Sequence, residues 1–276
     1  MLLQSAAQPT NWDFAPSIIV MLLSQAVLYG FLAYIARRDG HWGQDIKGGH
    51  IIWFSLGLIT LFIALVSPLD ALSNDALFSA HMTQHILLAL IAPACLLIGT
   101  PRYWIHYLYD LPVLKKILPT LTHPIVTLVL FNFVLWLWHL PSLYEGALRD
   151  TNIHVLEHLM FLATGVLFWS PVLHDIPPQR GMGYLAKIGY LFFTMVSSSI
   201  LGAIFTFAQS AIYTFYGTAP LAFGLTPLDD QQLAGAIMWV PGGGLLLATI
   251  LIFFALWLQS EDRKGQAKYP PPPYVQ

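Results

Sequence analysis

The chain has 276 residues, of which 57% are hydrophobic and 9% are charged, and its formal net charge is −2. Soluble domains carry about 25% charged residues, so this composition excludes an ordinary soluble protein and indicates an integral membrane protein. The charge balance excludes a basic nucleic-acid-binding face. The single cysteine, Cys95, excludes an internal disulfide and a cysteine-cluster metal site.

Seven segments are long and apolar enough to cross a bilayer, which takes about 20 residues as a helix. In chain order, the predicted spans are Pro16–Ile35, His50–Val66, Phe78–Ile98, Pro124–Leu140, Asn152–Ser170, Tyr184–Phe207 and Leu233–Leu258. Pro93 is expected to bend the third span, and Pro241, which three glycines follow, predicts a kink or a close helix contact in the seventh. The sequence therefore predicts an all-α, multi-pass protein with an N-terminal segment (1–15), a seven-helix transmembrane domain (16–258) and an extended, proline-rich tail (259–276).

The basic residues alternate between the predicted loops. Eleven of the twelve follow the first, third, fifth and seventh spans: Arg37, Arg38, Lys47, Arg102, Lys115, Lys116, Arg180, Lys187, Arg263, Lys264 and Lys268. Arg149 alone falls on the other side. The positive-inside rule then predicts an orientation with the N-terminus outside and the C-terminus in the cytoplasm.

Two pairs of histidines, His81/His85 and His154/His158, lie near the starts of the third and fifth spans. Residues four apart on a helix share one face about 5–6 Å apart, so each pair can hold one ion from one side. An ionisable side chain inside a membrane costs roughly 2.5–3.5 kcal/mol and usually faces a partner or a metal. Both pairs are expected within two turns of the outer surface, roughly 3–11 Å deep, where they can share a metal ion.

Further metal-capable side chains are expected at the same depth. His139 ends the fourth span and Met238 lies near the outer end of the seventh, so both are predicted to be additional or transfer ligands. Imidazole combined with a thioether favours copper, and Cu(I) in particular. Met82 follows His81 by one residue and points elsewhere on the helix, so we interpret it as a packing residue.

Two acidic residues are predicted to orient the ligands. Asp70 closes the second span on the outer side, and Glu157 lies three residues after His154. A carboxylate that accepts a hydrogen bond from a ligating imidazole fixes the tautomer and orientation of the ring. We therefore interpret Asp70 and Glu157 as orienting acceptors, Glu157 for His154.

The outer loop before the seventh span contains two tyrosines and an acidic end. Tyr213 and Tyr216 are interpreted as part of an aromatic belt at the membrane interface. Asp230 and Gln231 are either solvated residues that cap the seventh span or a carboxylate entrance for a cation. The sequence leaves both alternatives open.

Other interpretations of the histidines remain open. Each could form a hydrogen bond across helices and support packing in a purely structural scaffold. The stretch His154-Val-Leu-Glu157-His158 spells the H-x-x-E-H motif, which would make the protein an intramembrane zinc hydrolase with Glu157 as general base. Facing histidines could also bind haem in an electron-transfer protein.

Several stretches together resemble the seven-span CtaG-type cytochrome c oxidase assembly factors. They are Ser67–Asp70, Phe78–His85, Gly99–Pro101, Trp138–Pro141, Leu143-Tyr144, His154–His158, Phe168–Pro171 and Asp230–Gly242. The resemblance runs from about residue 50 to 260 and implies a non-enzymatic assembly factor in a bacterial plasma membrane. It further implies that the protein supplies copper to the CuB centre of oxidase subunit I, with an extracytoplasmic copper donor protein as a further partner.

Overall fold

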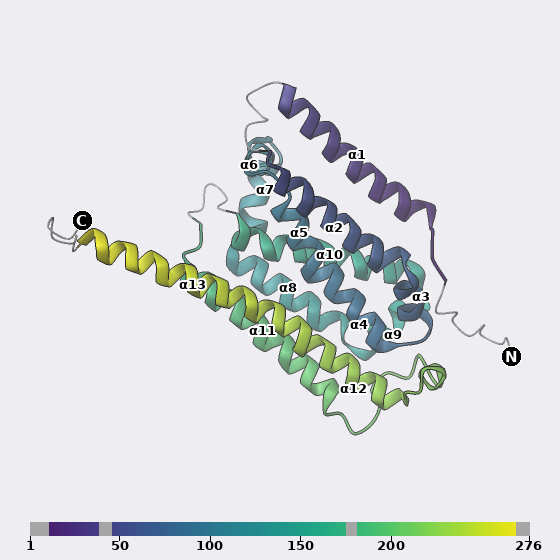
Figure 1. Cartoon of the computed structure of the whole chain (residues 1–276). Coiled ribbons are helices and arrows are strands. Elements are labelled where there is room, and N and C mark those ends of the chain that lie inside the picture. The colour runs from purple at the N-terminus through teal and green to yellow at the C-terminus, as the bar shows by residue number, and fades with distance from the viewer. Residues whose placement is uncertain (1–10, 39–45, 175–180, 269–276) are drawn as a thin grey trace.

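The structure is a computed structural model that describes residues 11–38, 46–174 and 181–268. Within these ranges every regular element is a helix, and the helices pack side by side in a bundle (Figure 1). Six helices are long and apolar enough to cross a membrane. The bent pair α7 (Leu114–Leu121) and α8 (Pro124–Trp138), whose axes differ by 69°, brings the number to seven. The prediction of an all-α, multi-pass membrane protein is confirmed.

The remaining spans lie close to their predicted positions. They are α1 (Pro16–Arg38), α2 (Gly48–Val66), α4–η1–α5 (Phe78–Ile86, Leu87–Ile91 and Ala92–Ile98), α10 (Thr151–Leu173), α11 (Tyr184–Thr206) and α12–η3–α13 (Pro227–Ile237, Met238–Gly242 and Gly243–Lys268). Short helices that the sequence did not predict lie between spans: α3 (Pro68–Asp75), α6 (Arg102–Asp110), α9 (Pro141–Arg149) and η2 (Ala219–Phe223).

The last span is longer than predicted at both ends. It begins at Pro227 because Thr226 and Asp229 form a capping box, in which each side chain bonds the other residue's backbone amide. It continues as helix to Lys268, past the predicted limit at Leu258, with an ion pair between Lys264 and Glu261 on its surface. The part of the predicted tail after Lys268 lies outside the described residues.

Both predicted interruptions are π-helical turns. In η1, directly before Pro93, the amide of Ala92 donates to the carbonyl of Leu87, five residues earlier. Pro241 lies inside η3. A proline has no N–H, so a regular α-helix would leave the carbonyl four residues earlier without its partner, and a wider turn relieves this defect. The first turn begins two residues after His85, and the second begins at Met238.

Helix α10 packs closely on the π turn η1. A Cβ built on Gly165 would collide with the carbonyl oxygen of Ala89 and would lie 2.8 Å from Cγ of Pro93. Only a residue without a side chain allows this approach, which is the small-residue packing typical of membrane helices. The contact fixes how far α10 lies from the third span, and both of these spans carry a histidine pair.

The outward faces of the long helices are apolar. Val20 and Val27 on α1, Ile52 on α2, Val129 on α8 and Ile252 on α13 are each at least 60% exposed. Large exposed apolar surfaces of this kind are stable against lipid rather than water. The protein is thus a multi-pass membrane protein.

The histidine-bearing ends of the helices gather at one end of the bundle. The starts of α4, α10 and α12 lie there together with α3 and α9, whereas α6 and α7 lie at the other end (Figure 1). The described part of the chain begins at the first end and α13 finishes at the opposite one, in agreement with an odd number of crossings. Which end faces the cytoplasm stays a prediction from the loop charges.

Candidate metal centre

The two histidine pairs occupy equivalent positions on two helices that start at the same end of the bundle. His81 and His85 are the fourth and eighth residues of α4, and His154 and His158 are the fourth and eighth of α10. The start of α10 is fixed by Asp150, whose side chain accepts hydrogen bonds from the first amides of the helix. Because α4 and α10 start at the same end of the bundle, residues at the same position in the two helices lie at the same depth in the bundle.

The four imidazoles form one cluster. The ring centroids of His81 and His154 lie 5.5 Å apart, those of His81 and His158 6.4 Å, and those of His85 and His158 5.9 Å. Within each helix the paired rings are 4.2 and 4.1 Å apart. The structure therefore brings together all four histidines that the sequence selected.

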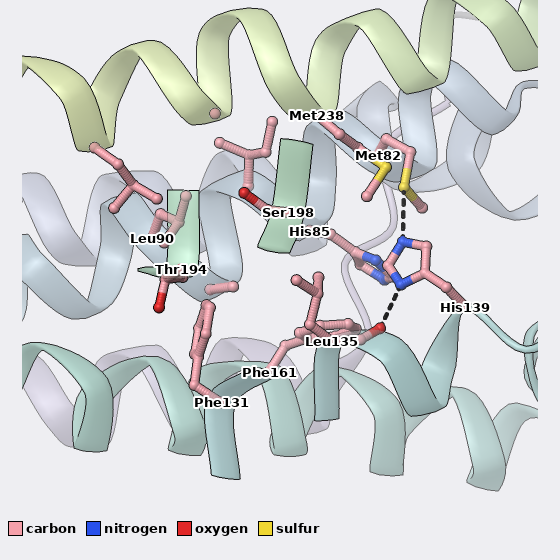
Figure 2. Close-up of a pocket in the computed structure, with 14 residues that line it drawn as sticks. Met82, His85, Leu90, Phe131, Leu135, His139, Phe161, Thr194, Ser198 and Met238 are labelled. Atoms are coloured by element: carbon pink, nitrogen blue, oxygen red, sulfur yellow. Dashed lines mark hydrogen bonds between the residues drawn. The ribbon is translucent and has the colours of Figure 1, made fainter. Parts of the chain in front are cut away.

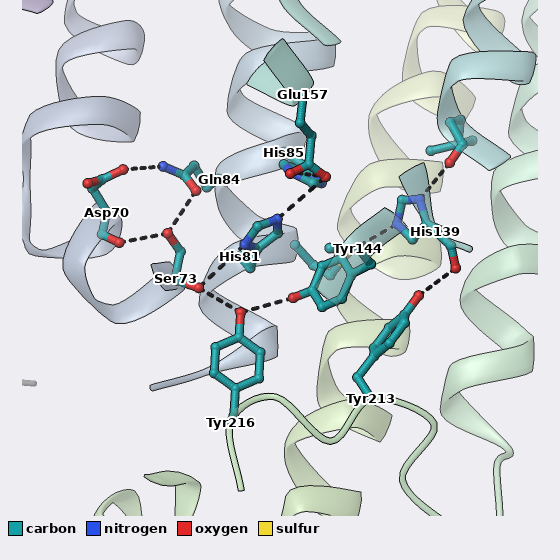
Figure 3. Close-up of polar contacts among 12 residues, drawn as sticks. Asp70, Ser73, His81, Gln84, His85, His139, Tyr144, Glu157, Tyr213 and Tyr216 are labelled. Carbon is teal, nitrogen blue, oxygen red and sulfur yellow. Dashed lines mark hydrogen bonds and ion pairs between the residues drawn. The ribbon is translucent and has the colours of Figure 1, made fainter. Parts of the chain in front are cut away.

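Glu157 points from α10 across to the histidines of α4 (Figure 3). Its Oε1 atom lies 3.5 Å from Nε2 of His85 and 3.9 Å from Nε2 of His81. Together, His81, His154 and Glu157 offer ligand atoms that all lie within 4.8 Å of one another. The sequence suggested that Glu157 orients His154, whereas this geometry gives the carboxylate itself the position of a ligand.

Several buried polar atoms of this cluster have no hydrogen-bond partner among the described residues. They are Nε2 of His81, both ring nitrogens of His85, Nε2 of His154, both carboxylate oxygens of Glu157 and Nε2 of His158. His81 and Glu157 are 0% exposed. Burying a polar atom without a partner costs free energy, and burying a carboxylate alone costs much more, so such groups normally meet a proton, a cation or water.

The distances from the Glu157 carboxylate to the rings of His81 and His85 suit a shared ion better than a direct hydrogen bond. Hydrogen bonds between nitrogen and oxygen usually measure 2.7–3.2 Å, less than both distances from Glu157. Two ligand atoms that are each about 2.1 Å from a tetrahedral metal ion lie about 3.4 Å apart. The observed 3.5 Å to His85 fits this spacing, and the 3.9 Å to His81 is longer by about 0.5 Å. The donor atoms and the distance to His85 therefore fit a first-row metal ion.

A chain of hydrogen bonds leads from this cluster to the loop before α12 (Figure 3). Nδ1 of His81 lies 3.4 Å from the carbonyl oxygen of Ser73, which also accepts a 2.6 Å hydrogen bond from the Tyr216 hydroxyl. The Tyr144 hydroxyl in turn donates to that of Tyr216 at 2.9 Å. A carbonyl can only accept, so Nδ1 of His81 carries the hydrogen and Nε2, which faces Glu157, keeps its lone pair.

The belt interpretation of Tyr213 and Tyr216 is wrong. The two tyrosines are 6% and 8% exposed and both contact Tyr144, Tyr213 through its ring and Tyr216 through its hydroxyl, while Tyr213 donates a 2.7 Å hydrogen bond to the carbonyl of His139. Burial raises the pKa of the Tyr144 and Tyr216 hydroxyls well above their usual value, so both stay protonated donors. The sequence places both tyrosines in a loop next to a span, and this position does not indicate that the loop folds back into the protein.

Asp70 supports the cluster through Gln84 rather than through a histidine. Its Oδ1 atom accepts a 2.7 Å hydrogen bond from Gln84, whose side-chain oxygen accepts one from Ser73 at 2.8 Å. Burial is the main cause that raises the pKa of Asp70 to about 6. Through Gln84 and Ser73, this carboxyl group fixes the end of α3 against α4 beside His81, and its orienting role stays a prediction.

Asp230 and Gln231 make structural contacts at the same end. Asp230 accepts hydrogen bonds from the backbone amides of Phe78 and Ser79 at 2.7 and 3.2 Å, and so caps α4 from another helix. The side-chain oxygen of Gln231 accepts a 2.6 Å hydrogen bond from the amide of Ile212. Asp230 thus fixes the helix start from which the positions of His81 and His85 follow, and the entrance role remains a prediction.

His139 and Met238 lie beside the cluster, around a separate cavity of about 50 Å³ that His85 and Met82 also line (Figure 2). The ring centroids of His139 and His85 are 6.2 Å apart. Met82 is 1% exposed, and its sulfur lies 3.3 Å from Nε2 of His139. Met82 does point away from His81, as predicted, but toward another candidate ligand.

The fold and the site together define a class of protein. It is a multi-pass helical membrane protein with a buried cluster of histidines and one carboxylate near one end of the bundle. From residue 27 to 260 the sequence matches the family described as cytochrome c oxidase caa3 assembly factor (Caa3_CtaG). The chain belongs to this family.

Similar sequences occur in mycobacteria. Uncharacterised proteins of Mycobacterium bovis and Mycobacterium tuberculosis are both 26% identical over 92% of this chain, and one of Mycobacterium leprae is 25% identical over the same share. The chain spans 40% of the length of these relatives. No solved structure matches the chain.

Proposed function

We propose that this protein is an assembly factor for cytochrome c oxidase, its partner. It carries copper at the cluster of His81, His85, His154, His158 and Glu157, and supplies it to the CuB centre of oxidase subunit I. The observation that carries the proposal is the set of buried ring nitrogens and carboxylate oxygens that share one space and have no partner among the described residues. Imidazole is a good ligand for copper, and one carboxylate offsets part of the ion's charge.

The proposal explains why the ligands are buried and yet lie near one end of the bundle. In the orientation predicted from the loop charges, an extracytoplasmic donor protein delivers copper at that end. The apolar surroundings keep water and competing ligands away from the ion. Because the ligands come from two helices, a small displacement of α10 against α4 weakens all the bonds together, as a carrier that must release its cargo requires.

The space in the site favours an ion over haem. Sites for ligands of drug size or larger usually have volumes of roughly 300–1,000 Å³. The cavity beside the cluster measures about 50 Å³, and the imidazoles of His81 and His154 stack with centroids 5.5 Å apart. An absorption spectrum of the purified protein tests this point, because bound haem would give a Soret band.

The test is elemental analysis of the reduced, purified protein together with the activity of the oxidase in the same cells. Replacing His81 and His85 by alanine should lower bound copper and oxidase activity together. His50→Ala with His106→Ala is the matched control, because these histidines lie at the other end of the bundle. Bound copper that stays at the parent level while oxidase activity is lost would contradict a cargo role and favour a structural scaffold.

A further inference from the structure

We propose that Met82, His139 and Met238 form a second metal site, which is selective for Cu(I) and lies one ligand away from the histidine–carboxylate cluster. This inference rests on the proposed copper function and adds a binding step to it. The three residues come from three segments, namely α4, the end of α8 and the π turn η3. All three are buried, with exposures of 1%, 6% and 7%.

The hydrogen bond of His139 determines which of its ring nitrogens is free. Nδ1 lies 2.6 Å from the carbonyl oxygen of Leu135, one turn earlier in α8. A backbone carbonyl can only accept, so Nδ1 carries the hydrogen of the neutral ring. Nε2 therefore presents a lone pair, and this lone pair faces the cavity (Figure 2).

The atom that faces this lone pair is a sulfur with lone pairs of its own. Sδ of Met82 lies 3.3 Å from Nε2 of His139, and a thioether has no hydrogen to donate. Two acceptors in direct contact do not attract each other. A cation between them turns the contact into an attraction, whereas protonation of the ring would place a charge beside apolar side chains.

The separation of the two atoms suits a metal ion. With bonds of about 2.0 Å to the imidazole nitrogen and about 2.3 Å to sulfur, a nitrogen–sulfur separation of 3.3 Å gives an angle of about 100° at the ion. This value lies in the range of three- and four-coordinate sites. Met238 lines the same cavity, and Figure 2 shows its thioether next to that of Met82.

The ligand set selects the metal. Thioether sulfur is a soft donor that favours Cu(I), while zinc and other harder cations favour the nitrogen and oxygen atoms of the histidine–carboxylate cluster. Methionine in a membrane core usually serves packing alone. Here the acceptor-to-acceptor contact, which packing does not explain, distinguishes the site.

His85 connects the two sites. It lines the cavity of the methionines, its ring centroid is 6.2 Å from that of His139, and its Nε2 atom is 3.5 Å from the Glu157 carboxylate. Both of its ring nitrogens lack a hydrogen-bond partner among the described residues. Cu(I) can then pass between the sites by ligand exchange through His85, without a change of oxidation state.

The experiment uses two probe ions, Ag(I) as a redox-inert substitute for Cu(I) and Co(II) for the harder site, with the full chain in detergent. The parent should bind both ions at once. The double variant Met82→Leu/Met238→Leu should bind Ag(I) at least tenfold more weakly and keep Co(II), whereas His154→Ala/His158→Ala should lose Co(II) and keep Ag(I). Leucine has a volume close to that of methionine, so the exchange is a mild one, and Met21→Leu on α1 is the matched control.

X-ray absorption of the Cu(I)-loaded parent gives a second readout that does not depend on variants. It should show sulfur at about 2.3 Å from copper. Ag(I) affinity that is unchanged in the double leucine variant, or copper with nitrogen and oxygen neighbours alone, would overturn the second site. If the second site binds as expected but oxidase activity survives without the histidine cluster, the copper-supply proposal fails and the second site stands.

Discussion

Replacing Gly165 by alanine should weaken copper binding, although this residue lies about two helical turns from the nearest histidine. Its Cα is where α10 packs against the π turn η1, and the added Cβ would collide with the Ala89 carbonyl. Cγ of Pro93 lies 2.8 Å from the same Cβ. In a regular α-helix the amide of residue 93 would donate a hydrogen bond to the Ala89 carbonyl, but proline has no N–H. Both obstacles are rigid parts of the backbone or of a ring, so the helices themselves must move.

The size of the movement follows from ordinary contact distances. Carbon atoms that are not bonded approach to about 3.5–4.0 Å, so relieving the 2.8 Å contact requires a shift of about 1 Å. Overpacking of this kind typically costs about 1–3 kcal/mol. Metal–ligand bonds tolerate about 0.2 Å, so His154 and His158 on α10 no longer match His81 and His85. We expect copper affinity to fall at least about tenfold, or 1.4 kcal/mol.

The assay combines thermal unfolding of the purified protein with a competition titration against a chromophoric Cu(I) chelator, performed in the Met82→Leu/Met238→Leu background so that the titration reports the histidine–carboxylate cluster. Gly189→Ala on α11 is the control, because its added Cβ meets no atom within 4 Å. Alanine there should leave copper affinity unchanged and stabilise the helix by up to about 1 kcal/mol. Parent-like stability and affinity in Gly165→Ala would refute the idea that this contact sets the distance between the two histidine pairs.

Two further predictions concern the carboxyl groups. Glu157→Gln should lower copper affinity at least about 10–100-fold, because a neutral amide replaces a carboxylate beside the ion. Unchanged copper affinity would contradict the proposed ligand, and a hydrolase would instead keep zinc and lose activity. Burial, with smaller contributions from Asp13 and Asp75, raises the pKa of Asp70 from 3.8 to about 6 against the opposing hydrogen bond from Gln84. The folded state therefore binds this proton more tightly, and the associated stability, about 3 kcal/mol, is complete below pH 4 and lost as the pH rises through 6. Asp70→Asn should flatten this part of the pH profile of chemical unfolding, and a profile like that of the parent would contradict the assignment.

The sequence predicted the spans because hydrocarbon imposes a simple length requirement on helices. It also predicted that His81, His85, His154 and His158 meet, because equal spacing from two helix starts on one side of the membrane gives one depth. The short helices α3 and α9 were missed, since each is shorter than a span and polar enough to read as a loop. These helices bring Ser73 and Tyr144 to the cluster.

The residues that sequence analysis misjudged share a physical feature, which is that their roles depend on the angle between helices. Spacing along the chain places Met82 on a different side of α4 from His81, but it does not reveal which helix covers that side. The same limit applies to Glu157, which sequence proximity assigns to His154 and the packing of α10 on the third span assigns to His81 and His85. That packing depends on Gly165 and on the carbonyl of Ala89, one turn before Pro93, where no side chain carries a chemical signal. In this protein, a glycine and a proline, which cannot bind a metal, determine how the ligands on two helices face each other.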